Sequence, residues 1–96
     1  MLQPKTIGEM SVRERKELLA AVADTLDQSA REARASGDER FALNSRSLAL
    51  IIRGSAEDLS HHELHAAELL LEQGISMIEE FRVRAGTSAG STSTLH

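Results

Sequence analysis

The most regular feature of this sequence is a series of apolar and small residues between positions 64 and 85. The series comprises Leu64, Ala67, Leu71, Gly74, Ile78, Phe81 and Ala85. Steps of three and four residues place all of them on one face of an α-helix, as in the seam of a coiled coil. A helix with such a face is stable in water only when that face packs against another element. The pattern therefore predicts a helix that has at least one helical partner.

The composition favours an all-α fold with a single small core. Hydrophobic residues make up 41% of the chain and aromatic residues only 2%, namely Phe41 and Phe81. Leu and Ala, which favour helices, supply most of the apolar surface, and β-branched residues are scarce. The chain has no cysteine, which excludes a disulfide scaffold, a thiolate zinc site and a cysteine nucleophile. Two independent folding units do not fit in 96 residues, because a domain below about 40 residues usually needs disulfides, metal or a partner. The chain is therefore expected to form one domain.

A first helix is predicted over about residues 11–36. Ser11 and Glu14 have the spacing of a capping box, in which the serine and glutamate side chains satisfy free backbone amides. Gly37 fits the left-handed position that closes a helix. The apolar stripe of this helix comprises Leu19, Val22, Leu26, Ala30 and Ala33.

A second helix is predicted over about residues 38–53, with Asp38 as its cap and Gly54 after its end. Apolar residues fall on several of its sides, which predicts a central place in the bundle. They are Phe41, Leu43, Leu48, Leu50, Ile51 and Ile52.

The third helix, which carries the seam, is predicted over about residues 56–85. Its start stays open between Ser55 and Ser60, because Ser60 and Glu63 also form a capping box. Gly74 costs about 1 kcal/mol relative to Ala in a helix interior. Either another backbone passes close to Gly74, or the helix merely tolerates or bends at this glycine.

The three helices define a single helical domain over residues 11–85. Residues 1–10 are expected to be a lead-in that can fold over the bundle but adds no core. Residues 86–96 form a Gly/Ser/Thr-rich tail that is expected to be flexible, since small polar residues cannot offset the entropy of ordering.

The helix lengths predict an antiparallel bundle that homodimerisation completes. The outer helices correspond to about 37 Å each and the middle one to about 22 Å, which leaves about 15 Å of the long helices uncovered. The residues expected at this oligomer interface are Leu19, Val22 and Leu26, facing Leu64, Leu71, Gly74, Ile78 and Phe81. Replacing Leu71 by Asp is expected to dissociate or unfold the assembly.

Three histidines lie close together at the start of the third helix. His61 and His65 are four residues apart and Glu68 follows one turn later, which on a helix would suit a divalent metal ion. The simpler interpretation is a solvated first turn. No cofactor is therefore expected, and a metal site at these three residues is kept as an alternative.

Charge and the lack of motifs limit the classes of function. Residues 1–54 hold nine Lys or Arg against eight Asp or Glu, and residues 55–96 hold two against seven. With positive and negative residues so mixed, the chain lacks the concentrated positive surface that binding of nucleic acid requires.

No apolar run approaches the roughly 20 residues of a membrane span, and no signal peptide is evident, so we expect a cytoplasmic protein. No phosphate loop, serine elbow or carboxylate pair suggests an enzyme.

The function expected from the sequence is that of a small non-enzymatic helical protein–protein interaction module. It would act as a homo-oligomer, as an adaptor, chaperone or regulator with a further protein partner. The alternative is a nucleic-acid-binding regulator or a histidine-based protein that binds a divalent metal.

Overall fold

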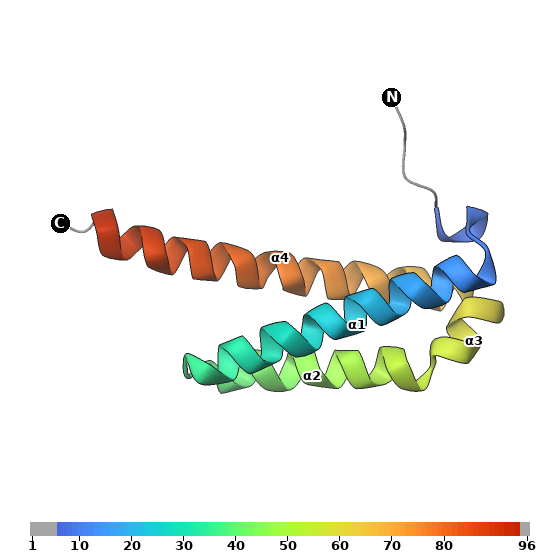
Figure 1. Cartoon of the computed structure of the whole chain (residues 1–96), viewed down its shortest axis with the longest axis horizontal. Helices are drawn as coiled ribbons and strands as arrows, with labels where there is room; N and C mark the ends of the chain where they lie inside the picture. The colour runs from blue at the N-terminus through green and yellow to red at the C-terminus, as the bar shows by residue number, and fades with distance from the viewer. Residues whose placement is uncertain (1–5, 95–96) are drawn as a thin grey trace, which may run out of the picture.

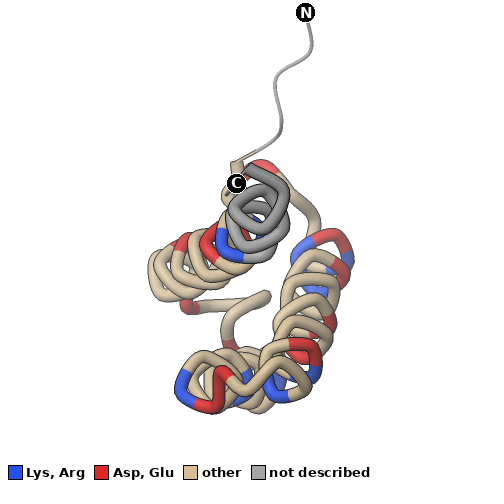
Figure 2. Tube along the Cα trace, turned by 90° about the vertical axis from the view of Figure 1, so that its left-hand side faces the viewer, with Lys and Arg blue, Asp and Glu red and all other residues tan. Residues whose placement is uncertain are grey.

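The computed structural model describes the backbone of residues 6–94 and the side chains of residues 6–84. The chain is all-α, as predicted (Figure 1). Its elements are the 3₁₀ turn η1 (Ile7–Glu9) and the helices α1 (Val12–Ala35), α2 (Glu39–Gly54), α3 (Ala56–His61) and α4 (Leu64–Thr94). Charged positions of both signs occur along the helices when the molecule is viewed from its end (Figure 2). No helix among the described residues is long and apolar enough to cross a membrane.

Helices α1 and α2 form an antiparallel hairpin whose ends are set by local signals. At the start of α1 the Glu14 amide donates to Ser11 Oγ over 3.1 Å, and the Ser11 amide donates to Glu14 Oε1 over 2.9 Å. This is the predicted capping box. Gly37 has a φ of 90° in the turn between the helices, a conformation that costs a residue with a Cβ extra energy. Asp38 then caps α2 by accepting a hydrogen bond from the Phe41 amide.

Helix α4 lies against the hairpin and closes the main core. Its buried residues Leu71 and Ile78 join one cluster with apolar residues from both other long helices. Those residues include Leu19, Val22 and Leu26 of α1 and Leu48 and Ile52 of α2. The seam and the first apolar stripe therefore meet inside one chain. A smaller cluster near the α1–α2 turn contains Ala30, Ala33, Phe41 and Ala42, with Met77 and Phe81 packed against it.

The single helix expected over residues 56–85 is instead two helices, which is a correction. Helix α3 ends at His61 and α4 begins at Leu64. The backbone amides of His62 and Glu63 both donate to the Asp58 carbonyl, over 2.8 and 2.9 Å. These two bonds turn the chain out of the axis of α3. Helix α4 then runs antiparallel to α2 and lies against α1 (Figure 1).

Arg15 of α1 donates one hydrogen bond to the chain at this break and another to η1. Its Nη1 donates to the Ser60 carbonyl over 2.9 Å, and its Nε donates to the Ile7 carbonyl over 2.8 Å. The last carbonyls of a helix have no partner within it, and the guanidinium satisfies one of them. Arg15 thereby joins η1, α1 and α3.

Two further expectations need correction. Helix α2 is not central, because Leu43, Leu50 and Ile51 are 63%, 57% and 51% exposed. Helix α1 packs more extensively than α2 against both α3 and α4. The lead-in does contribute to the core, because Ile7 is only 6% exposed and belongs to the main cluster.

Helix α4 runs on to Thr94 and so includes residues 86–94, which were expected to belong to the tail. The side chains after Arg84 and the whole of residues 95–96 lie outside the described residues. Flexibility of this segment stays a prediction.

Candidate functional site

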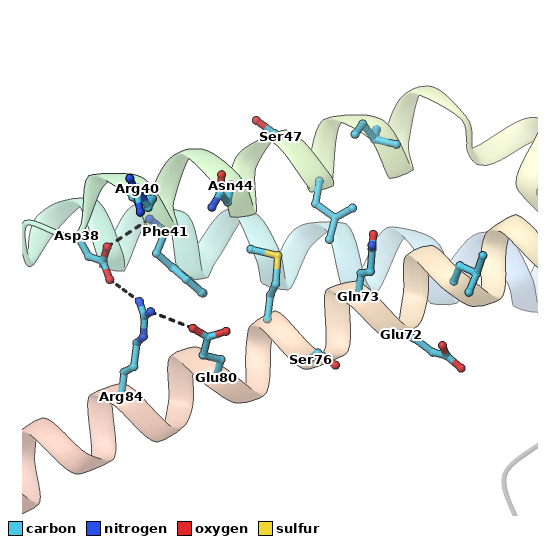
Figure 3. Close-up of a pocket in the computed structure, with 14 residues that line it drawn as sticks. Asp38, Arg40, Phe41, Asn44, Ser47, Glu72, Gln73, Ser76, Glu80 and Arg84 are labelled. Atoms are coloured by element: carbon cyan, nitrogen blue, oxygen red, sulfur yellow. Dashed lines mark hydrogen bonds and ion pairs between the residues drawn. The ribbon is translucent and has the colours of Figure 1, made fainter.

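A groove with a volume of about 850 Å³ lies between α2 and α4 (Figure 3). Its floor is apolar and consists of the buried side chains of Phe41 and Leu48 and the half-buried Met77. Ile51 on α2 and Leu69 on α4 line the groove as well and are about half exposed, at 51% and 50%. Leucine and isoleucine are more often buried than this, so the groove is an apolar surface that no described residue covers.

Polar side chains form the rims of this groove. Asn44 and Ser47 stand on the α2 side, and Gln73 and Ser76 stand on the α4 side (Figure 3). An apolar floor within a polar rim is the usual arrangement of a protein–protein interface. The groove therefore has the surface chemistry of a binding site for another protein segment.

One end of the groove is held by an ion-pair network that joins α2 to α4. Arg84 Nη1 lies 2.6 Å from Asp38 Oδ2, and Arg84 Nη2 lies 2.9 Å from Glu80 Oε2 (Figure 3). Because Asp38 also caps α2 through its other oxygen, the cap that starts α2 positions α4 too. The network ties the two walls of the groove together at this end.

The two phenylalanines of the chain meet beside this network. The rings of Phe41 and Phe81 stack with their centroids 5.3 Å apart and their planes at 19°. The guanidinium carbon of Arg84 lies 5.3 Å from the centre of the Phe41 ring, within the range of a cation–π interaction. Aromatic and ionic contacts therefore fix the same end of the groove.

On another side of the hairpin, Arg53 of α2 pairs with two aspartates of α1. Its Nη2 lies 2.6 Å from Asp24 Oδ1, and its Nη1 pairs with Asp27 Oδ2. Hydrogen bonds to Asp27 and Asp24 raise the pKa of Arg53 above its ordinary value. This contact fastens the middle of α1 to the end of α2.

Most of the residues predicted for the oligomer interface are buried inside the single chain and do not line the groove. Leu19, Val22, Leu26, Leu71 and Ile78 are buried in the core of one chain, as is Gly74, whereas Leu64 and Phe81 are half-buried. Their burial is thus accounted for without a second copy, and their place in an interface stays a prediction.

The site residues predicted from the sequence did not include Ile51, Leu69 or Met77, all of which line the groove. Ile51 did stand out as one of the apolar residues that fall on several sides of α2. That pattern was interpreted as a sign that α2 is central.

The predicted metal residues lie on both sides of the break between α3 and α4. His61 Nε2 is 3.2 Å from Glu57 Oε2, whereas His65 Nδ1 is 3.8 Å from Glu68 Oε1. The helical spacing assumed for His61 and His65 does not hold, because α3 ends between them. Over residues 6–84, no three His, Cys, Asp or Glu side chains come together in a way that could hold a metal. Metal binding at His61, His65 and Glu68 stays a prediction.

Comparison of the chain with protein-family models, curated proteins and solved structures gives no match. The function is therefore argued from the groove and its surroundings.

Proposed function

We propose that this chain is a small non-enzymatic helical protein–protein interaction module that works as a homo-oligomer, with the cytoplasm as its expected location. A second copy would occupy the groove between α2 and α4. The observation that carries this proposal is the apolar floor of the groove, together with the half-exposed Ile51 and Leu69 beside it. Three helices with an open apolar groove commonly bury it against a further amphipathic helix.

The charges at the groove favour a second copy as the occupant. Arg40 on the α2 side and Glu72 on the α4 side both line the groove, and neither has an ion pair among the described residues. A two-fold axis across the middle of the groove would bring Arg40 of each copy towards Glu72 of the other. Such an isologous interface satisfies both charges and covers both apolar floors.

The test is the mass of the particle in solution at micromolar concentration, measured by sedimentation velocity for the wild type and for Ile51→Glu and Leu69→Glu. We expect a dimeric wild type and two folded monomeric variants, since a carboxylate in the groove would be buried without a partner on association. Circular dichroism checks that the variants keep their helices, as both positions are exposed in the single chain.

Val83→Glu is the matched control, because Val83 is also an exposed apolar residue of α4 but does not line the groove. It should leave the mass of the particle unchanged. A folded monomeric wild type would overturn the homo-oligomer, and dissociation by the control alone would place the interface elsewhere.

A further inference from the structure

A second hollow lies between α1 and α2 and has a strongly basic lining. Its volume is about 280 Å³. The basic residues that line it are Arg31 and Arg34 of α1 and Arg46 and Arg53 of α2, and the only carboxylate among the lining residues is Asp27. Ala30 and Ala42, both buried, contribute small side chains to the same hollow, which leaves space between the arginines.

Only one of these arginines is neutralised by carboxylates. Arg53 pairs with Asp24 and Asp27. Arg31 Nη2 has a neutral partner, the Gln28 side-chain oxygen at 3.3 Å. Arg34 and Arg46 have no side-chain partner within residues 6–84. Three guanidinium groups from two helices thus line one small space without a compensating negative charge.

The number of guanidinium groups points to the kind of anion that would fit. One arginine fork can satisfy both oxygens of a carboxylate. A phosphate group has three or four terminal oxygens and up to two negative charges, so it can accept from several forks at once. The hollow is too small for an extended partner, and its arginines surround a single space instead of forming a long positive stripe.

We propose that the hollow formed by Arg31, Arg34 and Arg46 is a binding site for a phosphate group. The anion would reduce the repulsion among the three arginines and link α1 to α2 near their connecting turn. Free phosphate and the phosphate of a small monoester share this chemistry.

The test measures binding of inorganic phosphate by two-dimensional NMR and by thermal unfolding, at an ionic strength held constant with sodium chloride. Phosphate should shift the signals of residues around Arg34 and Arg46 in a saturable way and raise the midpoint of unfolding. Arg34→Gln and Arg46→Gln should each weaken binding about tenfold, because a hydrogen bond to a charged group is lost.

Arg13→Gln is the matched control, because Arg13 is an exposed arginine of α1 that pairs with Glu17 and does not line the hollow. It should bind phosphate as the wild type does. Equal binding by Arg34→Gln, Arg46→Gln and the wild type would overturn the proposal, and so would an equal loss in the Arg13 control.

A second arm of the experiment uses phosphoserine in place of inorganic phosphate. Binding of both ligands would show that the site accepts a phosphate monoester, whereas binding of inorganic phosphate alone would identify the free anion as the ligand. Leu69→Glu, which affects the groove on α4, should leave phosphate binding unchanged. The two proposals can therefore fail separately.

Discussion

Gly74 is the position at which a single methyl group would change how α4 packs on α1. A Cβ atom built there lies 2.7 Å from Val22 Cγ1 and 3.4 Å from Leu26 Cδ1. Val22 is β-branched and buried, so its side chain has little freedom to move. Close contact with side chains of α1 therefore explains the glycine, whereas the sequence had suggested a neighbouring backbone or a glycine that is merely tolerated.

We expect Gly74→Ala to lower the free energy of unfolding by about 1 kcal/mol. Overpacking costs about 1–3 kcal/mol, and the better helix propensity of alanine returns about 1 kcal/mol. Urea denaturation followed by circular dichroism measures the difference. Val22→Ala should make the Gly74→Ala change less harmful, because it removes the methyl groups that the new Cβ would meet.

Gly54→Ala serves as the control for this prediction. Gly54 is the last residue of α2, and a Cβ there would meet no other atom within 4 Å. The substitution should be neutral or stabilising. A Gly74→Ala protein that is more stable than the wild type would show that α4 does not approach α1 as closely as described.

At the scale of the elements, the contact of Arg15 with η1 and α3 makes a prediction about local stability. Arg15→Met keeps much of the apolar stem but removes the donor to the Ser60 carbonyl and leaves the Ile7 carbonyl with only the Met10 amide, at 3.3 Å. We expect a loss of about 1–3 kcal/mol in unfolding free energy. Amide hydrogen exchange should also become faster in η1 and α3 than in α2.

Arg13→Met is a suitable comparison, because Arg13 lies on the same helix and is paired only with Glu17 at the surface. Its effect should stay within about 0.5 kcal/mol. If both variants change exchange in α3 equally, Arg15 has no special part in holding that helix.

The ion pair between α3 and α1 predicts a dependence on pH. Glu57 Oε1 lies 3.1 Å from Lys16 Nζ. The hydrogen bond and charge of Lys16, with a smaller effect of His61, hold the pKa of the Glu57 carboxyl below its ordinary value of 4.5. Since the pKa is lower in the folded chain, the pair stabilises the fold above pH 4.5 and this contribution is lost as the pH falls through the lowered value.

Glu57→Gln should therefore be less stable than the wild type at pH 7, and the difference should vanish in acid. Lys16→Met should follow the same course. The effect should be small and should shrink in 1 M salt, because both side chains are exposed. A difference that grows as the pH falls would contradict the assigned pair.

Helix ends that depend on neighbouring residues could be predicted from the sequence, and contacts between distant residues could not. Ser11, Glu14, Gly37 and Asp38 act within one turn of the chain, and their roles were predicted correctly. The break after His61 is stabilised in part by Arg15, whose bond to Ser60 spans 45 positions. No local pattern contains that information. The groove was missed for the same reason, since the exposure of Ile51 depends on where α4 lies.

At the scale of the whole molecule, two leucines on α4 allow folding of the single chain and the proposed assembly to be tested separately. Leu71 is 6% exposed and belongs to the main core, whereas Leu69 is 50% exposed and lines the groove. We expect Leu71→Asp to lower unfolding free energy by several kcal/mol, because it buries an unpaired carboxylate. Leu69→Asp should keep the helical signal and the unfolding midpoint of a monomer.

Circular dichroism together with light scattering distinguishes these outcomes. A folded Leu71→Asp protein would show that the main core is not as described. A Leu69→Asp protein that loses its helices would mean that the groove residue contributes to folding of the single chain.

The stacked pair of Phe41 and Phe81 has a practical consequence for spectroscopy. The chain has no tryptophan and no tyrosine, so it has almost no ultraviolet fluorescence of its own. Phe81→Trp would put a lone fluorophore against the ring of Phe41, which lines the groove at the end held by Asp38 and Arg84. Its emission would shift to shorter wavelength as water leaves the groove, which makes filling of the groove visible in a simple titration.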